Sequence, residues 1–306
     1  MTTIAVVTSI TFGGNLRTCF EAGLNASGAH SVTIPPPYEA KGNYSLLPTY
    51  VQNAASTKPD LIVAAGGLPT AIAAAQNLNQ NNGDPQFVYL SGILLNTMNK
   101  CNSGGANQNV PMENQARKEK LTDPPLNVPD ASRIWLVVNN NNQFSGAEIN
   151  AWGNANVQPF FQGGPNNPPA NTNDNSNNNN FIQEFHNLAI MATPPLGLVI
   201  SPDPYFRHWR TAFTIALADQ LPVPVCYPYG EFVDAANTTG NAGNSTSLNL
   251  PHLARPSSAN PTQIAATAYY QLGLKAGQYL IAKASGHPTQ FVGVTTWDAV
   301  SKKWGP

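Results

Sequence analysis

The chain has 306 residues and a net charge of -1, with 15 Lys and Arg against 16 Asp and Glu. This length is enough for about two domains with sizeable cores, which excludes a disulfide-stapled miniprotein. Charged residues make up only 10% of the chain, against roughly 25% in ordinary domains. Because no strong positive field is present, nucleic acid and anionic membranes are poor candidate partners.

Asparagine dominates the polar residues, with 37 copies. An amide-rich surface with few charges favours self-association, and a soluble surface under compositional drift is the alternative interpretation. Cys19, Cys101 and Cys226 are widely spaced, which favours small buried residues over a zinc site or disulfide scaffold. We expect no metal and no cofactor.

No run of residues approaches the ~18 apolar positions of a membrane span. The start of the chain, Met1–Ile10, has no charged n-region and no cleavage site of small residues. We therefore expect a periplasmic or extracytoplasmic location if a signal peptide was removed, and a cytoplasmic one otherwise.

The first third of the chain alternates short apolar runs with amphipathic segments. Strands are expected at 4–10, 31–34, 61–65 and 87–90. Helices are expected from Gly14 to about Leu24, at 46–55 and at 70–78. The polar stretch 96–129 has no periodicity and is interpreted as a linker or insertion.

The alternation then resumes in a second α/β half. Strands are expected at 134–138, 157–161, 196–200 and 223–226, with a last one at 291–294. Helices are expected at about 147–154, 182–191, 206–221 and 264–284. The asparagine-rich stretch 163–180 is interpreted as an exposed connection.

Strands that alternate with helices predict βαβ units and parallel sheets. The expected fold class is α/β, with two doubly wound parallel-sheet lobes. We assign residues 1–95 and 236–286 to lobe 1 and residues 130–235 and 287–306 to lobe 2.

Ligands of such sheets bind beyond the carboxyl ends of the strands, near helix N-termini. The residues at these strand ends are mostly hydroxyl, amide, glycine and aromatic types, with few charges. The candidate ligand-binding residues are Ser9, Phe12, Gly66, Gly67, Thr70, Ser91, Asn141, Asp203, Tyr205 and Tyr229.

Several of these candidates have structural alternatives. Gly66 and Gly67, followed by Pro69 and Thr70, allow backbone N–H groups to approach a carboxylate, but they also suit an ordinary turn. Asp203 can accept an ammonium or hydroxyl group, or it can cap the helix that follows. Aromatic candidates such as Phe12 can form stacking walls or belong to the core.

Known catalytic signatures are missing from the sequence. It contains no GxSxG elbow, P-loop, HExxH or GxGxxG motif. None of the five histidines pairs with another at metal-ligand spacing. Asp203 and Glu231 are a possible acid/base pair, but we expect a protein that is not an enzyme.

Several segments occur in a familiar order along the chain. They are Lys58–Ala64 before Gly66–Ala71, Ser201–Phe206 before Leu221–Pro224, Tyr229–Val233, Tyr269–Gly273 before Ala276–Gly277, and Pro288–Phe291. Together they resemble the ABC-transporter substrate-binding protein family, which has the type I periplasmic-binding fold.

This resemblance implies two lobes that are joined by crossover hinge strands and close on a small solute, with an ABC permease as partner. It implies that the 66–70 turn binds a ligand carboxylate, that Asp203 faces an ammonium group, and that Asn141 lies at the corresponding second-lobe turn. The family's export signal and lipid-anchor cysteine are not found, and the Asn-rich segment 235–258 replaces a short strand with a ligand-facing tyrosine. The polar linker 96–129 is also longer than the family pattern.

The sequence therefore predicts a binding protein for a small polar or amphipathic, amino-acid-like solute. The alternative is a self-assembling or scaffold protein built on the same two-lobe fold, in a homo-oligomer or larger assembly.

Overall fold

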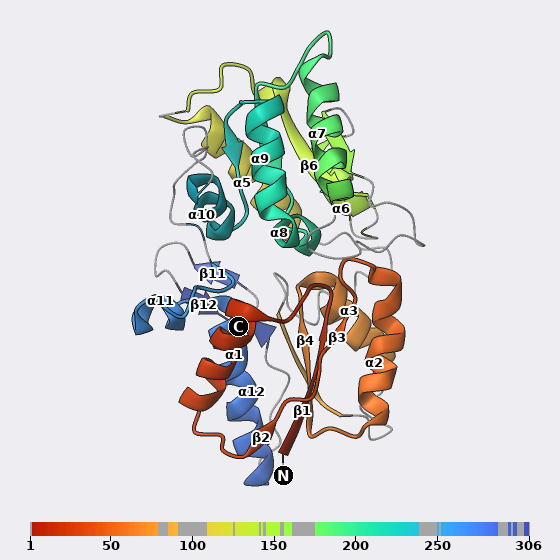
Figure 1. Cartoon of the computed structure of the whole chain (residues 1–306), viewed down its shortest axis with the longest axis vertical. Coiled ribbons are helices and arrows are strands. Elements are labelled where there is room, and N and C mark those ends of the chain that lie inside the picture. The colour runs from red at the N-terminus through yellow and green to blue at the C-terminus, as the bar shows by residue number, and fades with distance from the viewer. Residues whose placement is uncertain are drawn as a thin grey trace. The chain divides into compact units, whose positions relative to one another are not determined.

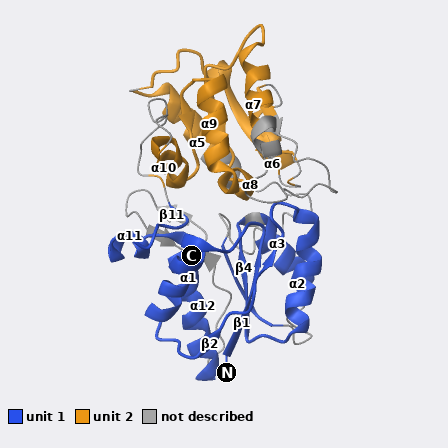
Figure 2. Ribbon diagram, in the orientation of Figure 1, with its two compact units in different colours: residues 1–105, 251–306 blue, residues 106–250 orange. Residues whose placement is uncertain are grey.

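A computed structural model describes residues 2–78, 85–90, 109–124, 126–140, 142, 145–153, 156–160, 175–238, 250, 252–286, 293–294, 296–298 and 303–305. The chain divides into two compact units (Figure 2). Unit 1 comprises residues 1–105 and 251–306, and unit 2 comprises residues 106–250. Each unit is an α/β body with its own parallel sheet.

The sheet of unit 1 has six strands. They are β1 (Thr2–Thr8), β2 (Val32–Thr33), β3 (Tyr38–Glu39), β4 (Leu61–Ala65), β5 (Phe87–Leu90) and β10 (Gly293–Val294). The order is β10-β5-β4-β1-β2, β3 also pairs with β1, and all pairings are parallel. A separate antiparallel pair is formed by β11 (Thr296–Asp298) and β12 (Lys303–Gly305).

Helices cover both faces of this sheet. Helix α1 (Gly14–Ala26) packs on α12 (Ala268–Ala284), and α2 (Leu47–Ser56) packs on α3 (Leu68–Asn77). Figure 1 shows the two pairs on opposite sides of β1 and β4. All five residues of β4 are buried, as expected for a parallel strand covered on both faces. The short helices η1 (Tyr44–Leu46) and α11 (Pro261–Ala265) precede α2 and α12.

Unit 2 is built on a four-stranded parallel sheet of order β7-β6-β8-β9. Its strands are β6 (Ile134–Asn139), β7 (Val157–Phe160), β8 (Gly197–Ile200) and β9 (Val225–Cys226). Its helices are α5 (Asn109–Thr122), η3 (Ala131–Arg133), α6 (Ser145–Trp152), α7 (Asn175–Ala189), α8 (Pro204–His208), α9 (Arg210–Gln220) and α10 (Gly230–Thr238).

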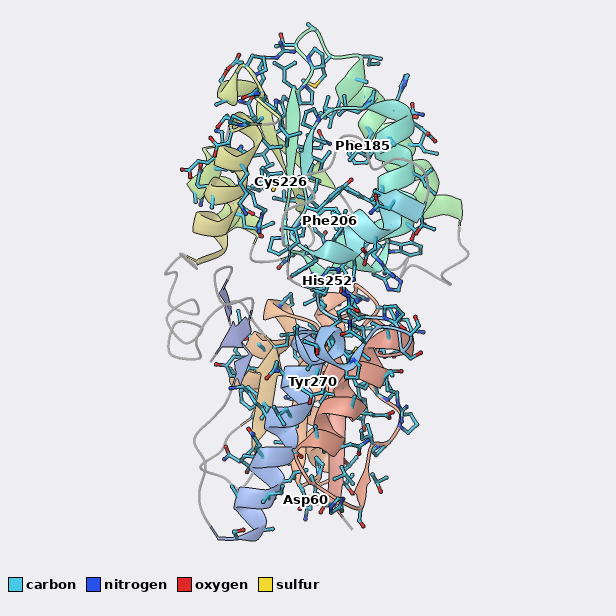
Figure 3. All side chains as sticks on the ribbon, turned by 90° about the vertical axis from the view of Figure 1, so that its left-hand side faces the viewer. Asp60, Phe185, Phe206, Cys226, His252 and Tyr270 are labelled. Carbon is cyan, nitrogen blue, oxygen red and sulfur yellow. The ribbon has the colours of Figure 1, made fainter. Side chains whose placement is uncertain are left out.

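Alternate residues of these strands enter two different cores. Leu198 and Ile200 of β8 belong to the core that contains Phe185 and Phe206, whereas Val199 belongs to the core that contains Cys226. Figure 3 labels Phe185, Phe206 and Cys226 in this unit. The period-two side-chain alternation of strands explains why successive residues belong to opposite cores.

Most of the predicted strands and helices are present, but several boundaries differ. The helix predicted at 206–221 is two helices, α8 and α9, which meet at Trp209. The helix predicted at 264–284 is likewise divided into α11 and α12. The predicted connection 163–180 includes 175–180, which form the first turns of α7. Helix α10 was not predicted.

The predicted linker 96–129 contains helix α5, which packs against α6, β8 and β9 in unit 2. This helix was missed because its polar sequence has no apolar stripe. It is anchored instead by Leu121, which is fully buried, and by the buried polar residues Asn114 and Arg117. Residues 96–108 of that prediction lie outside the described residues.

The unit boundaries also differ from the predicted lobes. Residues 236–250 belong to unit 2 rather than lobe 1, and residues 287–306 belong to unit 1 rather than lobe 2. The second difference has a clear cause, because β10 pairs in parallel with β5 and so extends the sheet of unit 1. No helix in the described part of the chain is both long and apolar enough to cross a membrane.

Candidate functional site

The β4–α3 turn of unit 1 is fixed by two glycines in the left-handed region. Gly66 has a φ of +117° and Gly67 a φ of +83°, conformations that favour glycine. A Cβ on Gly66 would lie 2.6 Å from both the backbone N and the Oγ of Ser9. The Ser9 hydroxyl donates to the Gly66 carbonyl at 2.5 Å. The ends of β1 and β4 are therefore held against each other.

Helix α3 begins directly after this turn and has no side-chain cap. Its N-cap residue is Gly67, and Pro69 lies in its first turn. Thr70 is fully buried, and its Oγ1 has no hydrogen-bond partner among the described residues. Because buried hydroxyls are normally paired and helix N-termini attract anions, this turn can receive an oxygen atom of a ligand.

Phe12, the neighbouring candidate, lies in the core of unit 1 instead. Its side chain is 2% exposed, and its ring contacts Phe20 edge-on, with centroids 5.6 Å apart, and Tyr269 at 6.1 Å. Its backbone N–H donates to Glu39 Oε1 at 2.7 Å. The structure therefore places Phe12 in the core, which is the structural alternative for this residue. The candidate Ser91 lies outside the described residues.

Asp203 in unit 2 serves as the N-cap of α8. Its Oδ1 accepts the Tyr205 N–H at 2.7 Å and the Asn139 amide at 3.3 Å, and its Oδ2 accepts the Asn142 amide at 2.6 Å. The side chain is only 4% exposed. Asp203 therefore caps α8, and its carboxylate also connects the end of β6 to the start of α8 by hydrogen bonds. The candidate Asn141 lies outside the described residues.

The two tyrosine candidates of unit 2 differ in environment. Tyr205 is 3% exposed and packs against the rings of Phe181 and Phe206. Burial raises the pKa of its hydroxyl, with a smaller contribution from the Asp203 charge. Tyr229 is half-buried, and its hydroxyl donates to the Pro202 carbonyl at 3.4 Å. Tyr205 is therefore a core residue, while Tyr229 keeps an exposed part.

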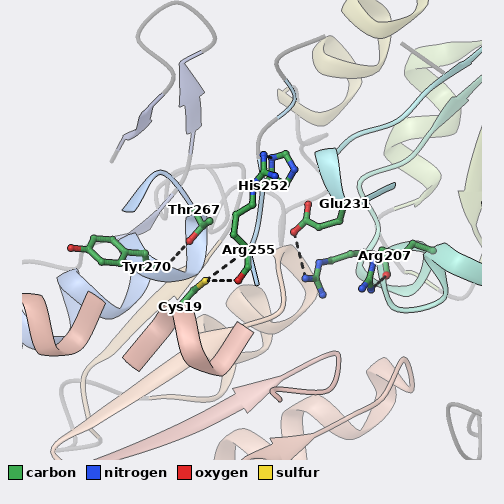
Figure 4. A network of polar contacts seen from close by, with 8 residues as sticks. Cys19, Arg207, Glu231, His252, Arg255, Thr267 and Tyr270 are labelled. Carbon is green, nitrogen blue, oxygen red and sulfur yellow. Dashed lines mark hydrogen bonds and ion pairs between the residues drawn. The ribbon is translucent and has the colours of Figure 1, made fainter. Parts of the chain in front are cut away.

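A buried charge pair that the sequence pattern does not predict is formed by residues of α8 and α10. Arg207 Nη2 lies 3.5 Å from Glu231 Oε1, and each side chain is 8% exposed (Figure 4). Arg207 Nε is buried and has no hydrogen-bond partner within the described residues. The separation exceeds the 2.7–2.9 Å that is typical of strong charge-assisted bonds. Charges are rare in this chain, so a buried pair is a notable feature of unit 2.

A second buried network surrounds Glu148 on α6. The sequence pattern does not predict this network either. Its carboxylate accepts hydrogen bonds from Asn114 at 2.8 Å and from the Ser201 hydroxyl at 3.0 Å. A single glutamate in a short helix carries no sequence signal for this role. Its partners lie 34 and 53 positions away in the chain.

Among the described residues, Cys19, Cys226 and His208 have structural environments. Cys19 and Cys226 are buried free thiols, and Cys19 Sγ lies 3.4 Å from both the backbone N and O of Arg255 (Figure 4). His208 packs edge-on against Trp209. Within the described ranges, no three His, Cys, Asp or Glu side chains are grouped to hold a metal ion.

No family model and no curated protein matches the sequence. Among solved structures, an ABC domain in complex with L-Trp from Streptococcus pneumoniae is 12% identical, with a TM-score of 0.58 over 96% of this chain and 90% of that one.

Two further structures agree over similar lengths. A carbohydrate transporter from Acidothermus cellulolyticus 11B in complex with myo-inositol is 15% identical, with a TM-score of 0.55 over 96% of this chain and 91% of that one. An ABC transporter solute-binding protein from Agrobacterium vitis with bound D-fucose is 13% identical, with a TM-score of 0.55 over 96% and 93%. The expected α/β class with parallel sheets is confirmed, and the chain has the fold of the solute-binding proteins of ABC transporters.

Proposed function

We propose that this protein binds a small polar or amphipathic solute and performs no chemical step on it. The observation that carries the proposal is the buried Thr70 hydroxyl, unpartnered within the described residues, in the uncapped first turn of α3. A buried hydroxyl without a partner costs stability, whereas a ligand oxygen would satisfy it. The α3 turn of unit 1 is therefore the first contact that we assign to the solute.

In unit 2, considered by itself, we assign solute binding to the Arg207–Glu231 pair. A neutral solute inserted between these groups would separate opposite charges without replacing either partner. A zwitterion offers a carboxylate to Arg207 and an ammonium to Glu231, so each charge keeps a partner. This charge complementarity favours an amino-acid-like solute over the sugars and polyols bound by several proteins of the same fold.

Isothermal titration calorimetry tests the proposal directly. The panel consists of the common L-amino acids, acetate, myo-inositol and D-fucose. We expect a one-to-one isotherm with at least one amino acid, weakened roughly tenfold to a hundredfold in Thr70→Val, because a hydrogen bond to a charged group contributes about 1.5–3 kcal/mol.

Thr214→Val is the matched control for this experiment. Thr214 is 1% exposed, but its hydroxyl donates to the Thr211 carbonyl at 3.1 Å. We expect this variant to bind as the wild type does. An isotherm unchanged in Thr70→Val, or no heat with any compound, would refute the proposal.

Four parts of the sequence prediction stay predictions: hinge closure, self-assembly, the permease partner and the location. Hinge closure on the solute is tested by small-angle scattering, in which the radius of gyration falls when solute is added. The alternative of a self-assembling protein is tested by light scattering at physiological salt, where a single monomeric species argues against it. An ABC permease as partner and an extracytoplasmic location belong to the solute-binding proposal.

A further inference from the structure

Glu148 is a buried carboxylate, and its two hydrogen-bond donors among the described residues are both neutral. It is 6% exposed, with Asn114 Nδ2 bonded to Oε2 and Ser201 Oγ bonded to Oε1. Neutral donors offset only part of the cost of burying a charge. A bound proton would remove that charge and leave both contacts possible, since a hydroxyl such as Ser201 can accept as well as donate.

The charges that face Glu148 do not offset its own. Asp203 repels it, and Arg117 attracts it. The Arg117 guanidinium, however, donates to the side-chain oxygen of Asn114, which stands between it and the carboxylate. Lys118, on the same helix α5, lies over the ring of Trp152, 4.8 Å from its centroid. Strand β6, which also packs against α6, carries no charged residue.

The net effect of burial and of these contacts is a raised pKa of Glu148. Burial is the main cause that raises the pKa of Glu148 to about 7, and the Asp203 charge adds to it. The hydrogen bonds from Asn114 and Ser201 and the charge of Arg117 act in the opposite direction. Near neutral pH, Glu148 therefore exchanges a proton within the folded unit.

Glu148 and Asp203 are part of one ring of contacts. Ser145, one turn before Glu148 on α6, donates to the Asn142 carbonyl at 2.8 Å, and the Asn142 amide binds Asp203. Ser201, two residues before Asp203, binds Glu148. The start of α6 and the β8–α8 turn are thus connected twice, once through each carboxylate.

We propose that Glu148 is a proton-binding site that locks the start of α6 to the β8–α8 turn of unit 2. With the proton bound, the ring contains the single negative charge of Asp203. Without the proton, two carboxylates are buried in the ring and α6 separates from the turn more readily. This inference goes beyond solute binding and does not depend on it.

Hydrogen exchange of the α6 amides, corrected for intrinsic rates, tests the proposal on the full chain. If opening exposes Glu148 to water, its ordinary pKa is restored in the open state. The opening equilibrium then rises about tenfold per pH unit between pH 5 and pH 7. Glu148→Gln keeps the shape without the charge, so we expect its opening to be independent of pH.

Glu184→Gln is the control, because Glu184 on α7 also accepts a bond from a neutral amide, Gln158, but is only half-buried. It should keep the wild-type pH dependence. A wild-type opening equilibrium that is constant from pH 5 to 7, or a Glu148→Gln slope equal to that of the wild type, overturns the proposal. If Glu148→Gln does not fold, carbon NMR of the wild-type protein measures the pH midpoint at which the Glu148 carboxyl group titrates. A midpoint near 7 supports the proton-binding site, and one near 4.5 overturns it.

Discussion

The Ser9 hydroxyl and the Gly66 carbonyl, 57 positions apart in the chain, are joined by a hydrogen bond of 2.5 Å. This bond joins the turns that follow β1 and β4, the two adjacent central strands of unit 1. It places the first turn of α3, with its buried Thr70 hydroxyl, beside the end of β1.

Gly66→Ala should destabilise the protein strongly. The new Cβ would lie 2.6 Å from Ser9 N and Oγ at a φ of +117°, so both steric overlap and backbone strain act, and we expect a loss of about 2–4 kcal/mol. Gly28→Ala is the control, because Gly28 has a φ of +85° but open space around it. Urea denaturation should show a loss of about 1 kcal/mol for Gly28→Ala; equal losses in the two variants would contradict the close approach of Ser9.

Gly273→Ala should disrupt the packing of α12 against α1. A Cβ at this position would lie 2.0 Å from the Phe20 carbonyl oxygen, and one at Gly23 would lie 1.9 Å from that of Tyr270. Because backbone cannot yield as a flexible side chain does, we expect a loss of at least about 3 kcal/mol. Gly146→Ala, in α6 with open space, should be neutral or slightly stabilising. If thermal unfolding shows Gly146→Ala to be less stable than Gly273→Ala, the close packing of α12 against α1 is refuted.

Asp203→Ala separates the capping role from a ligand role. The substitution leaves the Tyr205 N–H and the amides of Asn139 and Asn142 without their acceptor, so we expect a loss of about 2–4 kcal/mol in the free energy of unfolding. A variant of unchanged stability that binds solute poorly would show that Asp203 contacts the ligand, as the sequence resemblance implied.

The stability of the protein should carry a pH-dependent contribution from Glu148. Its pKa is raised from 4.5 to about 7 in the folded state, so the protonated form is favoured on folding. The contribution is complete below about pH 4.5 and is lost as the pH rises through 7. It amounts to about 3 kcal/mol. Relative to the wild type, Glu148→Gln should gain stability between pH 5 and 8; a difference that is constant over this range would contradict the shift.

The fold was largely predictable because its strands are continuous apolar runs. Every residue of Leu61–Ala65 is buried, and in Ile134–Val138 Trp135 alone is half-buried, so both apolar runs predict strands without reference to the rest of the chain. Helix α5 was not predictable in this way, because its amphipathic pattern is replaced by buried polar contacts that exist only once unit 2 has folded.

The candidate site was predicted in part. The Gly66–Thr70 turn follows from glycine, proline and a strand end, all of which are local signals. For Asp203, the sequence left a ligand role and a helix cap open, and the choice depended on Asn139 and Asn142, some 60 positions away. The Arg207–Glu231 pair likewise depends on tertiary structure, because α8 and α10 each pack against α9.

An amide NMR titration of the full chain, with the amino acid that gives the strongest calorimetric signal, tests whether the solute binds at the α3 turn. We expect the largest shifts in unit 1 at the amides of Gly66, Gly67 and Thr70, and we expect Thr70→Val to reduce them at a solute concentration near the wild-type Kd. Saturating solute that leaves these three amides unmoved would contradict the account.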